Sequence, residues 1–247
     1  MSSIPRIFSP NPTINWPVVT LDGDTVHHLK DVLRIRPGNR IEIVAGDTIW
    51  TVTLSEFTSK THLLAEVIDS IPASVLPVQI HLIQCLPKVD KLSDIIRTCT
   101  ELGVNRITPV ISDRCVSVPN EKSAAKHVRW MQIAASAAAQ SRQSRIPQID
   151  SVSRYETTVS EAVADSKIIF WEDSETPLRQ IIDPIGLTPH IQPRSVCIVI
   201  GPEGGLTPTE VQRAQTCGFQ VASLGPTILR VEHAGVVAMA QLMYALQ

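Results

Sequence analysis

Two hydrophobic patterns divide the chain of 247 residues. In the first 72 residues, β-prone runs dominate: residues 40–54 form two such runs joined at Gly46-Asp47, a hairpin signal, and residues 62–68 form another. Beyond residue 77, short apolar runs alternate with segments that have apolar residues at helical spacing. The pattern predicts a small β-rich domain followed by an α/β domain with a mostly parallel sheet.

The boundary between the two patterns is rich in proline. Residues 71–77 carry two prolines and are typical of a linker, so we expect a domain of residues 1–72 and a second of residues 73–247. Within the first domain, residues 25–36 have apolar residues at helical spacing and are followed by Pro37-Gly38, which predicts one helix.

The second domain is expected to alternate strands with helices. The predicted strands are residues 78–86, 107–111, 167–170, 196–200 and 221–224. The predicted helices are residues 91–102, 126–141 and a C-terminal helix that runs nearly to Gln247, and residues 183–194 are expected to be a loop.

One stretch, Val196–Glu210, combines a strand, a turn and a helix start. Its first five residues are apolar and mostly β-branched, as in a strand buried on both faces. Glycines at Gly201, Gly204 and Gly205 then turn the chain. The following Thr-Pro-Thr-Glu has the pattern of a helix N-terminus with a capping box. Ligands of open α/β sheets bind beyond the carboxyl end of such a strand.

The composition of this turn restricts the ligand. The turn lacks the lysine and the spacing of a P-loop, and it carries Glu203, whose carboxylate would repel phosphates. A phosphate-free ligand with hydroxyls or a positive centre, such as S-adenosylmethionine, fits better. The alternative is a tight structural turn with a solvated glutamate.

A second strand-to-helix turn follows. It runs from Gly225 to Arg230 after the predicted strand 221–224, and it would lie beside the first turn at one edge of the sheet. The pair Gly201-Pro-Glu-Gly-Gly-Leu206 and Leu224-Gly-Pro-Thr-Ile-Leu-Arg-Val-Glu-His-Ala234 resembles the SPOUT methyltransferases, and among them the family that methylates N3 of a uridine in small-subunit (16S) ribosomal RNA.

This resemblance extends over the whole chain, although Arg97, Ser136, Ala139, Val231 and His233 depart from the family's pattern. It implies S-adenosyl-L-methionine as cofactor, a PUA-like RNA-binding β-barrel at residues 1–72, and a SPOUT α/β domain with a C-terminal trefoil knot at about residues 196–240. It also implies a homodimer and a substrate within the small ribosomal subunit. The implied cofactor-binding residues are Glu172, Ile200, Gly201, Pro202, Glu203, Gly204, Gly205, Leu224, Gly225, Ile228, Leu229, Arg230, Glu232 and Ala234.

The reaction suggests roles for three charged residues. Uridine N3 is neutral and must lose a proton, so either a general base or a cation near the uracil oxygens would help. Arg230 is the leading cation candidate, and the alternative is a structural ion pair with Glu232. Glu203 and Glu232 are candidates for orienting the cofactor or for the base, and His233 is either catalytic or a packing residue.

RNA binding must come from local patches, because the formal net charge is −2. An ordinary solvated helix face is the alternative for the basic residues near the predicted helix 25–36. The candidate phosphate contacts are Arg6, Lys30, Arg34, Arg36, Lys88, Arg114 and Arg145.

Five dispersed cysteines without a C-x-x-C pair favour reduced thiols in a cytoplasmic protein, and neither a zinc site nor a membrane span is expected. Two other functions remain open. One is a non-enzymatic RNA-binding or ribosome-assembly factor, and the other is a SPOUT methyltransferase that acts on another RNA.

Overall fold

The computed structural model describes residues 4–9, 12–59, 61–74, 76–88, 91–116, 123–186 and 195–245. The chain forms two compact units. The N-terminal unit comprises Met1–Val75 together with Ala138–Ile146, and the C-terminal unit comprises Leu76–Ala137 and Pro147–Gln247.

The N-terminal unit is built on a six-stranded sheet in the order β1-β4-β5-β6-β3-β2. β1 is parallel to β4, and the other neighbours are antiparallel. The predicted hairpin is confirmed, since β4 and β5 pair with Ala45 opposite Thr48. The elements are β1 (Arg6–Phe8), β2 (Thr13–Asn15), β3 (Val18–Asp22), α1 (Asp24–His27), the π-helix η1 (His28–Val32), β4 (Arg40–Ala45), β5 (Thr48–Phe57) and β6 (His62–Pro72).

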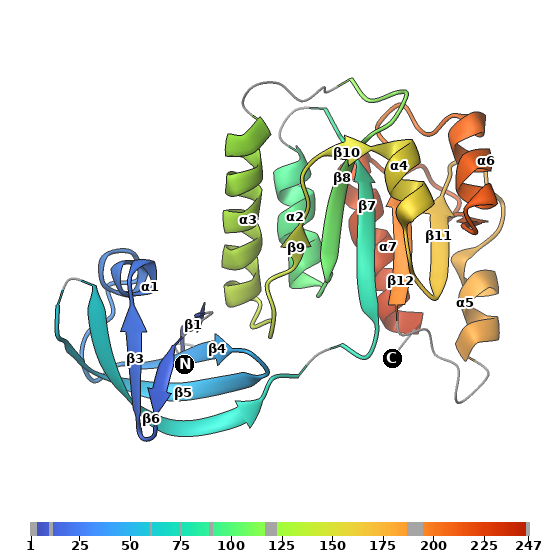
Figure 1. The fold of residues 1–247 in the computed structure, drawn as a ribbon. Coiled ribbons are helices and arrows are strands. Elements are labelled where there is room, and N and C mark those ends of the chain that lie inside the picture. The colour runs from blue at the N-terminus through green and yellow to red at the C-terminus, as the bar shows by residue number, and fades with distance from the viewer. Residues whose placement is uncertain are drawn as a thin grey trace. The chain divides into compact units, whose positions relative to one another are not determined.

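This sheet is strongly curved. β6 pairs with β5 along most of its length, and its first half also pairs with β3 (Figure 1). Two register shifts interrupt the β5–β6 ladder, and such bulges increase strand twist. Because β6 continues to Pro72, the first two residues of the predicted linker belong to a strand.

The predicted helix 25–36 is irregular. It consists of a short α-helical turn and the π-helix, and Arg34 has a positive φ of 52°. In a regular α-helix, residues six positions apart lie on different faces. Here the amide of Ile35 donates to the carbonyl of Leu29, and both side chains are buried in the core. Burial of both side chains accounts for the departure from the predicted helix.

The C-terminal unit contains a parallel sheet in the order β10-β8-β7-β12-β11-β13, with β9 paired to β8. The described elements are β7 (Gln79–Cys85), α2 (Lys91–Glu101), β8 (Arg106–Ile111), α3 (Ser123–Gln140), β9 (Gln148–Ile149), β10 (Ser153–Arg154), α4 (Tyr155–Glu161), β11 (Ser166–Phe170), α5 (Leu178–Gly186), β12 (Ser195–Ile200), α6 (Pro208–Thr216), β13 (Gln220–Ala222) and α7 (Val231–Ala245).

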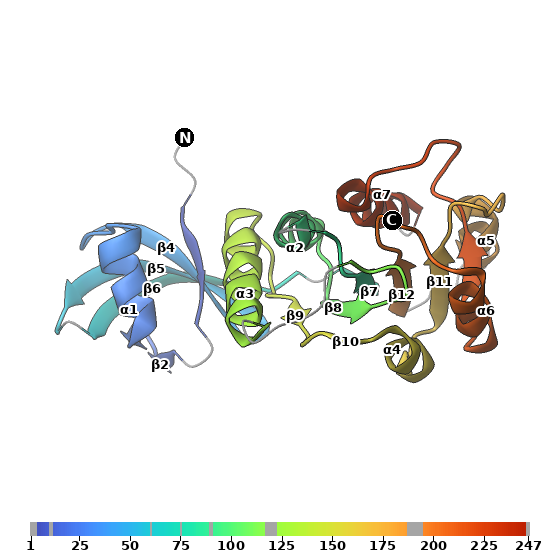
Figure 2. The same ribbon diagram turned by 90° about the horizontal axis from the view of Figure 1, so that it is seen from above.

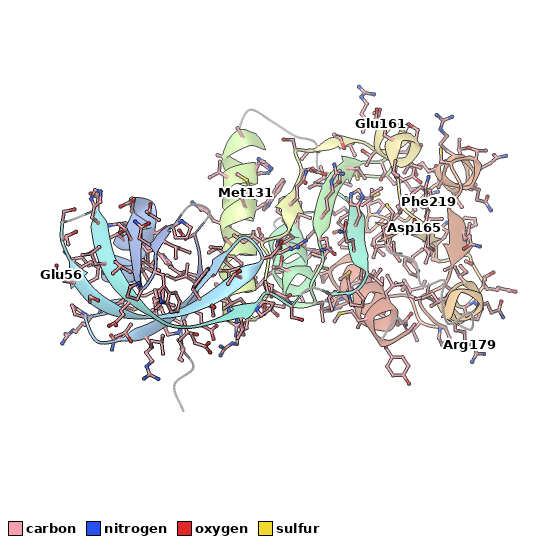
Figure 3. All side chains as sticks on the ribbon, turned by 60° about the horizontal axis from the view of Figure 1, so that its bottom comes forward. Glu56, Met131, Glu161, Asp165, Arg179 and Phe219 are labelled. Carbon is pink, nitrogen blue, oxygen red and sulfur yellow. The ribbon has the colours of Figure 1, made fainter. Side chains whose placement is uncertain are left out.

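Helices cover both faces of this sheet. α2 and α7 lie on one face and α4 and α6 on the other (Figure 2). Figure 3 shows how densely side chains fill the space between the layers, and labels Glu161 on α4 and Arg179 on α5. Two buried clusters correspond to the two faces: Leu92 and Met239 belong to the first, and Tyr155 and Val211 belong to the second. Parallel sheets require this two-sided cover.

The predicted alternation is confirmed, with differences at element ends. α5 includes residues 183–186, which were expected to be a loop, and the rest of that expected loop lies outside the described residues. β13 ends at Ala222, before the predicted end at Leu224. α4, β9 and β10 were not predicted. Among the described residues, no helix is long and apolar enough to cross a membrane.

Candidate functional site

The carboxyl ends of the parallel strands meet at one edge of the C-terminal sheet. Two loops leave this edge: the first ligand loop, Gly201–Leu206, follows β12, and the second ligand loop, Leu224–Arg230, follows β13. Together they line a cavity of about 600 Å³, with Phe170 and Trp171 from the end of β11 and Lys91 from the start of α2. This is the position that the strand–turn–helix pattern predicted.

The first ligand loop ends in the predicted capping box. The Thr207 hydroxyl accepts from the Glu210 amide at 3.2 Å, and the Glu210 carboxylate accepts from the Thr207 amide at 2.8 Å. The buried Glu210 carboxylate also accepts from the Asp113 amide at 2.8 Å. One side chain therefore starts α6 and fixes the turn after β8 to the loop.

Two glycines allow neighbouring side chains to approach the first ligand loop closely. Gly205 has a positive φ of 70°, and a Cβ there would lie 1.8 Å from Oε1 of Glu172. A Cβ on Gly204 would lie 3.1 Å from the Cβ of Arg114, whose guanidinium donates to the Gly204 carbonyl at 2.9 Å. The loop thus depends on glycine for both its conformation and its packing.

The two glutamates near the cavity are held by one lysine. The Glu203 carboxylate accepts from the Lys88 amide at 2.9 and 3.1 Å, and its Oε1 lies 3.7 Å from Nζ of Lys91. Oε2 of Glu232 accepts from the same Nζ at 3.0 Å. A hydrogen bond from its own backbone N–H and the contact with Lys91 lower the pKa of Glu232. Glu232 is therefore ionised at neutral pH and is a weak general base.

The second ligand loop is tied to α7. Gly225 has a φ of 134°, its amide donates to the Ser223 hydroxyl at 3.2 Å, and the Gln241 side-chain amide donates to the Leu224 carbonyl at 3.2 Å. The Arg230 carbonyl accepts from the amides of residues 233 and 234 at the start of α7. These bonds fix where the loop enters the helix.

Arg230 itself is exposed. No hydrogen bond or ion pair of its side chain is present in the described part of the chain, and Glu232 pairs with Lys91 instead. The alternative prediction, an Arg230–Glu232 pair, is thus wrong in this structure. His233 is also exposed, so it is not a packing residue.

The cavity brings together every residue that the sequence predicted to bind a cofactor, from Glu172 to Ala234. Lys91 also lines the cavity and had not been assigned to the site. Its signal in the sequence was its position at the start of the helix that follows β7. Its partners Glu203 and Glu232 could not be read from that position, because Glu232 is 141 residues away.

The residues predicted to contact RNA differ in how exposed their side chains are and in the contacts that they already make. In the N-terminal unit, the side chain of Arg6 is 7% exposed, and it donates to Glu42 at 2.8 Å and to the carbonyls of Arg142 and Gln143. Nε and one terminal nitrogen of its guanidinium are therefore engaged within the unit, and its contact with RNA stays a prediction.

The other predicted RNA contacts are exposed. Arg145 pairs with Asp47 at 3.1 Å, and the ammonium of Lys30 lies 5.5 Å from the Phe57 ring centroid. Arg34 and Arg36 in the N-terminal unit are exposed. Lys88 and Arg114 beside the cavity are also exposed, and the Arg114 guanidinium donates to the Gly204 carbonyl.

The cysteine thiols are buried or partly buried. All five cysteines are free. Burial raises the pKa of Cys99 and of Cys197 to about 12, and raises that of Cys85 further, so these thiols stay protonated. The described residues contain no group of three or more His, Cys, Asp or Glu side chains that could hold a metal ion.

The parallel α/β unit and its cavity define a class when they are compared with known proteins. A family model described as an RNA methyltransferase domain matches residues 74–243, and one described as an RNA methyltransferase PUA domain matches residues 21–68. The class is thus that of the RNA methyltransferases.

Curated relatives narrow the class. Ribosomal RNA small subunit methyltransferase E of Bacillus subtilis is 30% identical over 233 residues, covering 92% of this chain and 90% of the relative. The protein of that name from Mycobacterium tuberculosis is 32% identical, covering 90% and 84%. The chain belongs to the family of ribosomal RNA small subunit methyltransferase E.

Solved structures agree with this assignment. Ribosomal RNA small subunit methyltransferase E from Neisseria gonorrhoeae, bound to S-adenosyl methionine, has a TM-score of 0.83 and 29% identity, and 98% of each chain is covered. A methyltransferase from Legionella pneumophila in complex with the bound cofactor SAM has a TM-score of 0.85 and 28% identity, with the same coverage.

Proposed function

We propose that this protein transfers a methyl group from S-adenosylmethionine to N3 of a uridine in small-subunit (16S) ribosomal RNA. The observation that carries the proposal is the cavity between the two ligand loops, in a chain whose relatives are named ribosomal RNA small subunit methyltransferase E, one of them solved with S-adenosyl methionine bound. Glycines, apolar side chains and carboxylates line it, without a phosphate-binding lysine motif.

The residues present fit this cofactor. The volume of about 600 Å³ lies within the range of small-ligand pockets. Ile200, Leu224 and Leu229 supply apolar surface for a nucleobase, and the carboxylate of Glu172 is a hydrogen-bond acceptor for hydroxyls. When bound, S-adenosylmethionine supplies an electrophilic methyl group on a positively charged sulfur.

Arg230 is the proposed catalytic group. It lines the cavity, is exposed and has no ion-pair partner among the described side chains, so its guanidinium is free to contact a substrate. We assign to it the stabilisation of charge on the uracil oxygens as the N3 proton leaves. Glu203 and Glu232, held by Lys91, are assigned to site geometry and not to proton transfer.

The RNA is proposed to contact both units. Exposed Lys30, Arg34 and Arg36 belong to the N-terminal unit, which we propose to be an RNA-binding barrel of residues 1–72. Lys88 and Arg114 lie beside the cavity. The target base must leave its stack to reach the methyl group, as in other base-modifying enzymes.

Three further features complete the proposal. A trefoil knot within residues 196–240 is supported by the path of the chain, since β13 pairs with β11 while α7, which follows it, packs on α2 on the other side of β12. The proposed homodimer is supported by the small residues along α7 from Ala234 to Ala240, and by the exposed Tyr244 near the end of this helix. A cytoplasmic location matches the free cysteines and a ribosomal substrate.

A methylation assay tests the proposed activity. The purified protein and labelled S-adenosylmethionine would be incubated with small subunits, with large subunits and with transfer RNA. We expect label in the small-subunit RNA, recovered as 3-methyluridine. Label in another RNA would support a different substrate, and cofactor-independent RNA binding without label would support a non-enzymatic factor.

A further inference from the structure

One cation joins the two sides of the cavity. Lys91 is the first residue of α2, and its Nζ lies 3.0 Å from Oε2 of Glu232 and 3.7 Å from Oε1 of Glu203. Glu203 belongs to the first ligand loop, and Glu232 lies in the first turn of α7, directly after the second ligand loop. The side chain of Lys91 is 37% exposed, that of Glu203 is 23% exposed and that of Glu232 is 21% exposed, so water screens the contacts only in part.

The position of Lys91 is unfavourable without these partners. A cation in the first turn of a helix is opposed by the helix dipole, whereas a carboxylate there is favoured. Glu232 therefore sits at the favourable end of α7 and Lys91 at the unfavourable end of α2. Glu203 is fixed a second time by the Lys88 amide just before α2. The two carboxylates offset the cost of the cation, and the cation separates two like charges.

We propose that Lys91 is a positioning residue of the cofactor site, which clamps Glu203 and Glu232 and thereby holds the two ligand loops at the separation that the cofactor requires. The inference rests on the proposed function. Lys91 acts through the two carboxylates. Without its ammonium, the carboxylates repel each other and the loops move apart.

The other charges around the cavity determine what the loss of Lys91 does to the two ligand loops. The charged residues that line the cavity are Lys91 and Arg230 against Glu172, Glu203 and Glu232. His233 lies next to Glu232, and Asp94 on α2 is already paired with Arg97 at 2.6 Å. Removing Lys91 leaves one cation against three carboxylates. The carboxylates then repel one another with no cation between them, so neutralising one of them by substitution should restore the loop geometry.

Calorimetric titration with S-adenosylmethionine and with S-adenosylhomocysteine tests the clamp. Lys91→Met should bind both ligands about tenfold more weakly near pH 7.5, a change of about 1.4 kcal/mol. The double variant Lys91→Met/Glu232→Gln restores the original charge balance and should bind nearly as well as the wild type at pH 7.5.

Two controls separate the clamp from other effects. Lys126→Met removes an exposed lysine from the first turn of α3 and should leave affinity unchanged. Removing Lys91 makes the cavity more negative, which would attract the sulfonium of S-adenosylmethionine. S-adenosylhomocysteine has no sulfonium, so weaker binding of this ligand by Lys91→Met reports a change in the geometry of the site. Thermal unfolding of each variant verifies that it is folded.

Two results would overturn the clamp. They are equal or tighter binding by Lys91→Met at pH 7.5, and a loss that the double variant does not restore. Failure of the wild type to bind S-adenosylmethionine would instead overturn the proposed function, and the inference with it.

Discussion

Arg230 and Lys91 both line the cavity, but their surroundings differ. Lys91 is held between two carboxylates, whereas Arg230 is exposed and has no such partner in the described part of the chain. A paired cation supports the geometry of a site, and an unpaired one can respond to charge that develops in a substrate. This difference between two cationic residues separates the positioning role from the catalytic one.

We predict that Arg230→Ala lowers kcat about a hundredfold with little change in cofactor affinity, because its interaction grows as the N3 proton leaves. Arg230→Lys keeps the charge but not the planar fork, so it should recover part of the rate. Single-turnover methylation of small-subunit particles, beside cofactor titrations, measures both quantities. Wild-type turnover by Arg230→Ala, or a failure explained by lost cofactor binding, would refute this role.

A second residue-scale feature lies outside the cavity. His81 bonds to the Thr108 hydroxyl at 2.7 Å, Thr108 donates to Asp150, and the Cys197 thiol lies 3.7 Å from Nδ1 of His81. Burial and the charge of Arg106 lower the pKa of His81 from 6.5 to about 4. The imidazole is therefore neutral in the folded protein at neutral pH.

This lowered pKa predicts a pH dependence of stability. Between about pH 6.5 and pH 4 the unfolded chain binds a proton at His81 that the folded chain does not, so the free energy of unfolding falls as pH falls through this window. The loss should be on the order of 2 kcal/mol. His81→Gln should show a flatter profile in urea unfolding between these pH values. Parallel profiles for the two proteins would show that His81 is not responsible.

At the scale of elements, the sequence predicted a helix or strand correctly where the signals for it lie within a few residues of one another. Val196–Glu210 was predicted correctly as strand, turn and capped helix, because its β-branched run, glycines and capping box act within a few residues. The helix 25–36 was predicted as regular, because the burial of both Leu29 and Ile35 is decided by the rest of the core. The lysine clamp could not be predicted, since its partners are distant in sequence.

The first ligand loop allows a test of whether cofactor binding requires glycine at position 205. Gly205→Ala must push Glu172 aside and adopt a positive φ, so it should weaken S-adenosylmethionine binding at least about tenfold, equivalent to 1.4 kcal/mol. Gly218→Ala is the matched control, since Gly218 has a φ of 87° and no atom within 4 Å of the added Cβ. Both variants should lose about 1 kcal/mol or more of stability. Equal affinity for the cofactor in the two variants would contradict the proposed packing.

At the scale of the whole molecule, the account combines two units with separate cores. Periodicity predicted both, and the resemblance predicted what they do. The partition of the chain adds a detail that composition could not show: Ala138–Ile146 groups with the N-terminal unit, although its first three residues are the end of α3. The contacts of Arg142 and Arg145 with Glu42 and Asp47 account for this grouping.

The proposed homodimer gives a prediction at this scale. Tyr244 on α7 is 88% exposed, and a dimer built on α7 would cover it. Light scattering at micromolar concentration should show a dimer for the wild type and a monomer for Tyr244→Glu. Val163→Glu is the control: Val163 is 91% exposed and does not belong to α7, so this variant should remain dimeric. A fully active wild-type monomer would contradict the proposal.

The most direct test of the central claim is nucleoside analysis of 16S ribosomal RNA from a strain that lacks the gene. We predict that one 3-methyluridine is missing from this RNA, that it returns when the gene is restored, and that the Arg230→Ala gene does not restore it. The purified protein should add the same modification to small subunits from the deletion strain. An unchanged content of 3-methyluridine in the deletion strain, with no methylation of its subunits by the protein, would contradict the account.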